Sequence, residues 1–427
     1  MTRSKPFQFQ VAATDLLGLL LVATLPWSTS ATLILVALWA LALIPTITVA
    51  EWTAELRQAR SFLPVLFAIV GLAGMLWADV NLQARLSGFS SFWRFLLIPA
   101  LIIHFQRSNN GERAAIAFLL SCLLLLALSI GSAIDPRIAW WRMDNPGVPF
   151  KNQITQSLEF GVCALCLLAY SFECWRTGRR KLAILSTVLA LGFMGDIFFV
   201  ATSRTELVAI AAMLFVLALR VLGWKGVPAG LAVVICLGVT AWFASPYLRG
   251  RIFHGVWEFK QYEKIDQGTS IGARLEFWRR SLIFVAEAPI IGHGTGSIQS
   301  LFADSATGKE WIGTSHAVGT HRAAAMITPN PHNQTFAVAI QLGLLGVAVM
   351  YAMWLAHLLC FTRPGLFESF GIMVMVQMIV GCAFNSHLFD FTEGWFYVLA
   401  VSVLIGATRS HSANWLVTKR LPSIRGG

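Results

Sequence analysis

Residues 182–222 read "LAILSTVLALGFMGDIFFVATSRTELVAIAAMLFVLALRVL", two apolar runs that meet at a short polar stretch holding Arg204. The runs cover residues 182–201 and 205–222, and each is about as long as a helix needs to cross roughly 30 Å of hydrocarbon. Few charged side chains interrupt them. We therefore expect two successive membrane-spanning helices here, with Arg204 at the membrane surface.

The composition excludes a water-soluble protein. The chain has 427 residues, of which 56% are hydrophobic and 12% charged, and its mean hydropathy is +0.68. A soluble domain of this length could not cover its surface with so few polar groups. We predict an all-α polytopic membrane protein with about twelve transmembrane helices, at residues 10–27, 30–49, 61–78, 93–106, 114–134, 158–173, 182–201, 205–222, 226–244, 335–361, 369–388 and 390–407.

The basic residues predict how the chain is threaded through the membrane. Lys and Arg in short loops resist translocation and so mark the cytoplasmic side. With both termini inside, the inner segments hold most of these residues, including the cluster "WRTGRRK" at 175–181. The chain then divides into helices one to nine (1–244), an outer loop domain (245–334), helices ten to twelve (335–408) and a basic cytoplasmic tail (409–427).

The outer segment of roughly 90 residues needs structure of its own, because structureless loops beyond about 15 residues are uncommon. Within it, "GARLEFWRRSLIFVAEAP" (272–289) mixes apolar and basic residues in a pattern that suits a helix lying along the bilayer surface. "GHGTGS" (292–297) predicts a tight turn, helped by Pro289. A further short helix is predicted within "SIQSLFADSATGKEWIG" (297–313).

Basic residues on the outer side need a separate explanation. Arginines that topology does not require suggest an anionic ligand, and lipid phosphates and pyrophosphates are the expected anions at the outer face of a membrane. Arg204 also fits a second interpretation, a snorkelling arginine that anchors a helix end. Arg274, taken alone, is better explained by an amphipathic helix with a solvated basic face.

A second outer loop, "DPRIAWWRMDNPGVPFKNQITQS" (135–157), carries three basic residues, Arg137, Arg142 and Lys151. Their charges would add positive potential to an outer cavity and concentrate an anionic substrate there. The two tryptophans of the loop fit the aromatic belt of a membrane protein.

His332 lies in "TPNPHNQTFAVAIQLGLLG" (328–346), where a polar loop joins an apolar helix. Asn333 or Thr335 can cap the first turn of that helix, and Gly343 and Gly346 would permit close helix contact. On the residues alone, a histidine at an interface is more often a polar rim residue than a catalytic base. Both interpretations stay open at this point.

No metal site and no disulfide framework are predicted. His316 and His321 have no usual ligand spacing, and no carboxylate accompanies them. The chain also lacks an acidic cluster of the D-x-D kind that would hold a cation. Its seven cysteines lie in or beside the apolar runs.

Three groups of residues resemble a known family. His332-Asn333, nine further positions and Gly343-Leu344-Leu345-Gly346 fit one of its patterns, and Arg274, Trp278, Pro289, Gly292 and Gly294 are similar to its loop segment. "TSRTELVA", which contains Arg204, resembles the outer arginine that follows a membrane span. On these residues the chain resembles the bacterial O-antigen ligases of the O-antigen ligase and polymerase superfamily.

The resemblance implies a GT-C-like fold with a large, partly helical periplasmic loop between helices nine and ten. It implies transfer of a glycan from undecaprenyl pyrophosphate to a sugar hydroxyl of lipid A-core in lipopolysaccharide biosynthesis, at the periplasmic face of the bacterial inner membrane. The implied catalytic residues are His332 as base, with Arg204 and Arg274 at the pyrophosphate. Further substrate-binding candidates are Arg137, Arg142, Lys151, Arg279, Arg280 and Arg322.

The expected partners are the undecaprenyl-pyrophosphate-linked glycan as donor, lipid A-core as acceptor, and membrane lipids, without nucleic acid, metal or cofactor. We expect inversion at the anomeric carbon. An O-antigen polymerase is the nearest alternative, because it uses the same kind of donor. A secondary transporter or lipid flippase also has about twelve helices, and Asp196 and Asp390 are the intramembrane charges it would use. The third alternative is a noncatalytic partner of a glycan assembly complex.

Overall fold

The computed structural model describes residues 5–138, 147–201, 203–244, 270–306 and 330–420, with a few single residues between 246 and 257 and at 328. Every long regular element in these ranges is a helix. The helices are α1 (Lys5–Thr24), α2 (Thr29–Leu43), α3 (Val49–Leu56), α4 (Ala59–Ala73), α5 (Leu82–Phe89), η2 (Trp93–Leu97), α6 (Ile98–Ser108), α7 (Gly111–Ile134), η3 (Pro136–Ile138), α8 (Gln153–Arg176), α9 (Arg180–Phe199), α10 (Arg204–Leu222), α11 (Gly226–Ala244), α13 (Ser270–Glu287), α14 (Ile298–Ala306), α16 (Gln334–Cys360), α17 (Leu366–Phe384) and α18 (Phe391–Arg420).

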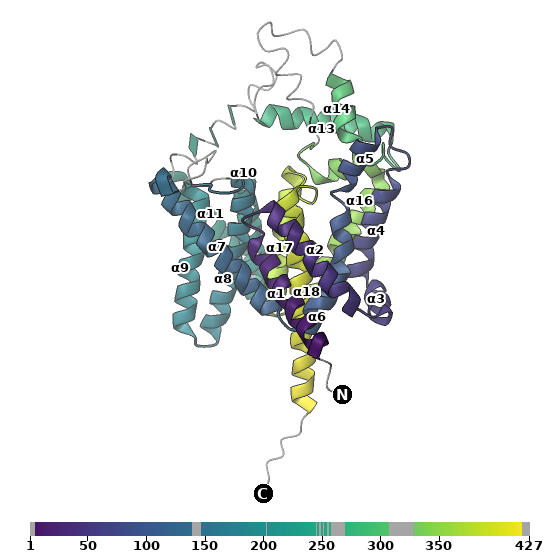
Figure 1. The fold of residues 1–427 in the computed structure, drawn as a ribbon. Coiled ribbons are helices and arrows are strands. Elements are labelled where there is room, and N and C mark those ends of the chain that lie inside the picture. The colour runs from purple at the N-terminus through teal and green to yellow at the C-terminus, as the bar shows by residue number, and fades with distance from the viewer. Residues whose placement is uncertain are drawn as a thin grey trace.

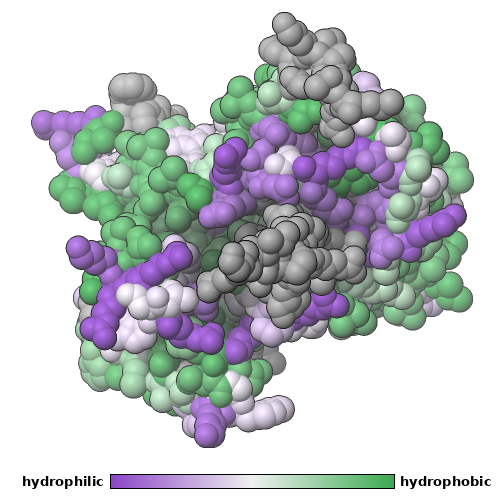
Figure 2. Space-filling model, turned by 90° about the horizontal axis from the view of Figure 1, so that it is seen from below, coloured by the Kyte–Doolittle hydropathy of each residue, from purple (hydrophilic) through white to green (hydrophobic). Residues whose placement is uncertain are grey.

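Most helices stand side by side in a bundle, and α13 and α14 lie at one end of it (Figure 1). We name this the loop end. The opposite end, where α1 begins and α18 ends, is the terminal end. Figure 2 looks onto the terminal end and shows hydrophilic residues gathered there between apolar flanks. This distribution is that of a bundle whose sides face lipid and whose ends face water.

The membrane class predicted from sequence is confirmed. Within the described residues, eight helical runs are long and apolar enough to span a membrane, or up to ten if each of two bent pairs is one span. The pairs are α3 with α4, bent by 89°, and α5 with Trp93–Ser108, bent by 43°. One of the eight runs, Arg204–Thr240, contains both α10 and α11, which pack on each other. The count of about twelve remains a prediction.

Local signals explain where some predicted boundaries moved. Helix α8 begins at Gln153, five residues before the predicted span, because the side chain of Asn152 accepts hydrogen bonds from the N–H groups of Ile154 and Thr155. Polar residues in its first turn hid that start from a search for apolar runs. The helix predicted at 272–289 is present as α13, and its position along the bilayer surface remains a prediction. α14 lies within the stretch predicted to hold a further short helix.

The interior of the bundle centres on α18. From Phe391 to Thr408 nearly every residue of this helix is buried, including Trp395 and Tyr397. Its main cluster is shared with α1, α2, α4, α6, α16 and α17, while a second cluster holds α7 to α10 together. A third, smaller cluster packs Phe277 and Phe284 of α13 against α14 and α16 at the loop end. The loop-end helices therefore have a core of their own that includes α16.

Helix α16 is broken at Gly343, whose φ of 61° and ψ of −161° are not helical. The chain after α13, residues 289–296, docks on the break. Four backbone hydrogen bonds of 2.8–3.2 Å join the segments, namely His293 N to Ile340 O, Gly294 N to Gln341 O, Leu344 N to Pro289 O and Leu345 N to Ile290 O. Backbone groups freed inside an apolar helix need such partners, because unsatisfied ones are costly in a membrane.

Glycine is required at this junction because the backbones approach so closely. A Cβ on Gly343 would lie 2.3 Å from the backbone of Ile290, and one on Gly292 would lie 2.5 Å from that of Gln341. The sequence predicted that Gly343 and Gly346 allow helix contact. The structure corrects this for Gly343, which instead opens its own helix to receive residues 289–296. We call residues 289–296 the strap, and most of the turn predicted at 292–297 belongs to it.

Substitution of Gly343 by Ala should destabilise the protein by about 1–3 kcal/mol, because alanine would be strained at positive φ and would clash with Ile290. The melting temperature in detergent measures this effect. Gly195→Ala in α9 is the matched control, since its added Cβ meets nothing within 4 Å. Equal melting temperatures for the two variants would show that the junction does not hold the fold.

Candidate functional site

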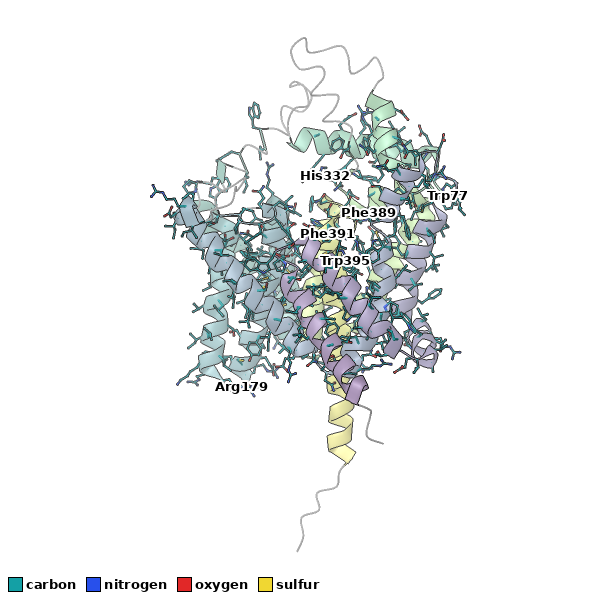
Figure 3. All side chains as sticks on the ribbon, in the orientation of Figure 1. Trp77, Arg179, His332, Phe389, Phe391 and Trp395 are labelled. Carbon is teal, nitrogen blue, oxygen red and sulfur yellow. The ribbon has the colours of Figure 1, made fainter. Side chains whose placement is uncertain are left out.

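His332 lies at the loop end, where the segment before α16 meets the turn between α17 and α18. In Figure 3 its label stands below α13, with Phe389 and Phe391 just beneath it and Arg179 at the far end. The backbone of His332 is left-handed, with φ 53°. Asn330 stabilises it by accepting a hydrogen bond from the His332 N–H at 2.8 Å. Such backbone strain in a residue other than glycine is uncommon and clusters at functional sites.

A short relay of hydrogen bonds fixes the imidazole. The amide nitrogen of Asn385 donates to the Asp390 carboxylate at 3.0 Å, which turns the amide oxygen toward His332. That oxygen lies 3.0 Å from His332 Nδ1 and can only accept, so Nδ1 carries the proton. The lone pair is therefore on Nε2. This is the tautomer that a general base needs when its second nitrogen faces the reactants.

The surroundings keep His332 uncharged. Its ring stacks on Phe277 of α13 with centroids 5.9 Å apart. Burial lowers the pKa of His332 below its ordinary value, and the positive charge of Arg274 lowers it further, while Asn385 and Asp390 act in the opposite direction. The net lowering leaves the imidazole neutral at pH 7, ready to accept a proton.

Arg274 and Arg204 come from distant parts of the chain and lie near each other. Arg274 is on α13, and Arg204 is the first residue of α10. Burial lowers the pKa of Arg274, and the charge of Arg204 lowers it further. Because Arg274 also acts on His332, the three side chains form one electrostatic group. Two cations in partial burial repel each other, so an anion placed between them would be favoured.

The amino end of α10 adds to this positive potential. Ser203 at the N-cap makes no side-chain capping hydrogen bond, and α10 is 19 residues long. The first N–H groups of a helix and its dipole favour an anion at this end. Arg204 is therefore placed where both its own charge and its helix attract a phosphate.

Arg279 and Arg280 are bound to Glu276. Arg279 donates to Glu276 twice at 2.9 Å, and Arg280 donates to it at 2.7 Å and to Ser305 of α14 at 2.8 Å. Burial raises the pKa of Glu276, but these hydrogen bonds outweigh burial and lower it overall. Arg280 therefore joins α13 to α14, while Arg279 is paired within α13. Their predicted part in substrate binding stays a prediction.

The remaining predicted substrate-binding residues have different surroundings. Lys151 donates to the Leu25 carbonyl and, at 3.0 Å, to Thr392, so it ties its loop to the starts and ends of neighbouring helices. Burial lowers the pKa of Lys151, opposed by Glu159 and Glu393. Arg137 is exposed in η3 at the loop end of α7. Arg142 and Arg322 lie outside the described residues.

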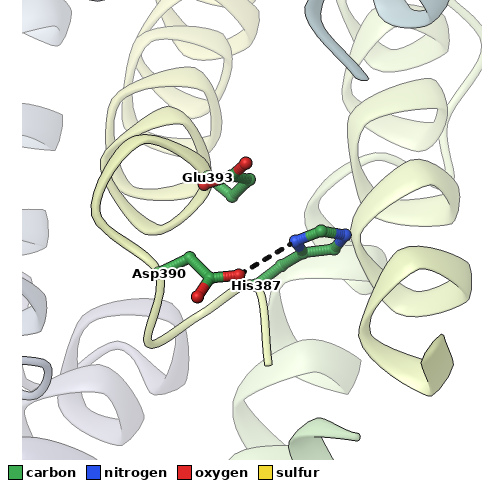
Figure 4. A group of neighbouring side chains, drawn as sticks. All are labelled: His387, Asp390 and Glu393. Atoms are coloured by element: carbon green, nitrogen blue, oxygen red, sulfur yellow. Dashed lines mark ion pairs between the residues drawn. The ribbon is translucent and has the colours of Figure 1, made fainter. Parts of the chain in front are cut away.

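The turn between α17 and α18 supplies three residues that the sequence analysis did not single out, His387, Glu393 and Asn385, together with Asp390. His387, Asp390 and Glu393 bring their ligand atoms within 4.8 Å of one another, with His387 Nδ1 3.4 Å from Asp390 (Figure 4). Asn385 belongs to the same turn. The signal was present in "NSHLFDFTEG" (385–394), which places polar residues at a join between two apolar runs, as at His332.

This cluster could hold a cation by geometry, but its charge is already opposed. Arg94 donates to the Asp390 and Phe391 carbonyls at 2.6 and 3.1 Å and lies near both carboxylates. The charge of Lys151 also interacts with that of Glu393. Two carboxylates near two side-chain cations leave little net charge for a metal ion.

Comparison with known proteins finds a family match for one part of the chain. Residues 188–351 match the family model described as O-antigen ligase. This part of the chain is similar to the O-antigen ligase family. The matched segment runs from within α9 to within α16, so it holds Arg204, Arg274 and His332.

A relative is found in Haemophilus influenzae, a protein described as uncharacterized. It is 26% identical over 167 residues, which cover 38% of this chain and 39% of that protein. The chain thus matches well under half the length of this relative. The roles proposed below therefore rest on this chain's own residues.

The electrostatic group predicts opposite effects of two substitutions on the pKa of His332. Arg274→Gln removes a charge that lowers this pKa and should raise it, whereas Asp390→Asn removes a charge that raises it and should lower it. The pH dependence of carbethoxylation at His332, followed by mass spectrometry, reports the neutral fraction. Arg179→Gln at the terminal end is the control. Shifts of the same sign in both variants would contradict the arrangement.

Proposed function

We propose that this chain transfers an O-antigen glycan from undecaprenyl pyrophosphate to a sugar hydroxyl of lipid A-core. The observation that carries the proposal is the meeting of a neutral, oriented imidazole with two arginines at one end of a membrane bundle. The match of residues 188–351 to the O-antigen ligase family supports a glycosyl transfer between lipid-linked partners. The specific donor and acceptor are the inference.

His332 acts as the base. The acceptor hydroxyl attacks the anomeric carbon of the donor, and Nε2 takes its proton as the new bond forms. General base catalysis of this kind contributes about 10²- to 10⁴-fold in rate. Asn385 holds the proton on Nδ1, and Asp390 holds Asn385, so neither touches the substrate in this scheme. They are positioning residues.

Arg204 and Arg274 act on the leaving group. As the bond between the anomeric carbon and the pyrophosphate oxygen breaks, its electron pair and negative charge move onto the pyrophosphate. One preorganised donor aimed at such charge contributes about 10²- to 10³-fold. The amino end of α10 adds its dipole on the same side. Direct displacement of this kind inverts the anomeric carbon.

We place the loop end in the periplasm and the terminal end in the cytoplasm of an inner membrane. The basic residues of the short connections, such as Arg107, Arg179 and Lys225, lie at helix ends that the threading rule assigns inside. α1 begins and α18 ends at that same end (Figure 1). The proposed site then faces the compartment in which lipid-linked glycans are joined.

The transporter alternative loses its main residues to other roles. Asp196 accepts hydrogen bonds from Ser129 and Gln156 and so ties α7, α8 and α9 together. Asp390 orients Asn385. A polymerase would use the same chemistry with a second lipid-linked glycan as acceptor. Deletion separates the two enzymes, because loss of a ligase leaves unsubstituted lipid A-core while loss of a polymerase leaves core bearing one repeat.

Transfer with purified protein, lipid-linked glycan and lipid A-core tests the roles. His332→Ala should lower kcat by about 10²-fold or more. Arg204→Ala and Arg274→Ala should each lower it by about 10²- to 10³-fold. Arg179→Ala, at the far end, should match the wild type. A folded His332→Ala protein with unchanged turnover would rule out the proposed base.

Activity should survive chelation, because the arginines supply the countercharge to the pyrophosphate. The same assay with EDTA measures this. Glu393→Gln is a second arm, because it removes a carboxylate from the one cluster of possible metal ligands found among the described residues. Two results together would overturn the metal-free mechanism. One is a loss of turnover in EDTA that a divalent ion restores, and the other is a lack of turnover in Glu393→Gln.

A further inference from the structure

A second cavity lies at the terminal end, far from His332. Its volume is about 570 Å³, and it is bounded by the start of α4, the last turns of α16 and the turn of α18 that holds Ile405 and Thr408. Polar residues gather at one side, among them Gln58, Arg363 and Glu368. Apolar residues make the rest of the wall. A cavity with one polar side and one apolar side suits an amphiphile.

The apolar part of the cavity, which we call the groove, is lined mainly by the last turns of α16. Ala352 and Ala356 lie one turn apart in this lining, and Leu355 and Leu359 are 56% and 61% exposed. Leu63 of α4 also lines it. α16 is a candidate membrane span, so these exposed leucines face hydrocarbon. The groove is therefore open to the acyl chains of the surrounding leaflet.

The polar part carries a net positive potential. α4 begins here, and Gln58 at its N-cap makes no side-chain capping hydrogen bond, so the positive end of the helix faces the cavity. Arg363 adds a full charge. Arg60 is paired with Glu55 at 2.7 Å and contributes none.

The acid on this wall, Glu368, is also compensated. Arg220 of α10 donates to the carbonyls of Phe361 and Arg363 at 2.9 and 2.8 Å, and its charge interacts with that of Glu368. The positive charge of Arg363 and of the amino end of α4 is therefore left without a compensating acid on this wall. Phosphate is the anion that a membrane leaflet offers at this depth.

We propose that this cavity binds one anionic phospholipid of the leaflet at the terminal end. Its phosphate lies between Arg363 and the first N–H groups of α4, and one acyl chain follows the groove over Ala352 and Ala356. Basic pockets between membrane helices at the cytoplasmic side hold anionic headgroups in this way. The site is separate from the proposed glycan transfer and does not depend on it.

Native mass spectrometry of the full chain, delipidated in detergent and titrated with phosphatidylglycerol or phosphatidylcholine, tests the site. We expect one tight phosphatidylglycerol per chain, weakened about tenfold or more by Arg363→Glu. Ala356→Trp, which fills the groove, should abolish binding while leaving the melting temperature near that of the wild type. Lys181→Glu, an exposed charge at the terminal end on α9, is the matched control.

Three results would overturn the proposal. If phosphatidylcholine bound as tightly as phosphatidylglycerol, the groove would bind acyl chains whatever the charge of the headgroup. Unchanged phosphatidylglycerol binding in Arg363→Glu would place the lipid elsewhere. Competition by inorganic phosphate alone, without a lipid, would identify a free anion site instead. Glycan transfer measured with saturating substrates should be the same in Arg363→Glu and in the wild type, which keeps this test distinct from that of the proposed function.

Discussion

The break in α16 at Gly343 is the constraint on which the loop end depends. A membrane helix that opens its hydrogen bonds must find new partners, and here residues 289–296 supply them through four backbone hydrogen bonds. Because the strap follows α13 directly, docking it holds α13 across the end of the bundle. Phe277 then stacks on His332, and Arg274 lies close enough to act on the imidazole. A backbone junction with no chemistry of its own thus sets the geometry of the proposed site.

The polar turn between α17 and α18 completes that geometry from the other side. Asp390 orients Asn385, and Asn385 fixes the tautomer of His332, so the base depends on a carboxylate that it does not touch. Arg94 in turn holds the carbonyl of Asp390. Buried polar networks of this kind are specific only when each member has a partner. The turn is held from beneath by a buried arginine and from above by the segment around Asn330.

The sequence predicted the membrane class, the surface helix α13 and the residues that meet at the loop end, because apolar runs and short motifs are local signals. It could not predict the docking at Gly343, since backbone pairing between residues about fifty positions apart leaves no periodic pattern. Asn385 was missed, and Asp390 was considered only as a transporter's charge, because their partner, His332, is distant in sequence. The ion pairs of Glu276 with Arg279 and Arg280 could have been predicted from their spacing of three and four residues on a helix. These pairs distinguish the two arginines from Arg274.

An experimental structure with undecaprenyl pyrophosphate bound is the most direct measurement of the central idea. The account requires the pyrophosphate at the loop end, with guanidinium nitrogens of both Arg204 and Arg274 at charge-assisted hydrogen-bond distance, about 2.7–2.9 Å, and the His332 ring on the side from which an acceptor hydroxyl would approach. A pyrophosphate bound elsewhere, or in contact with neither arginine, would contradict it.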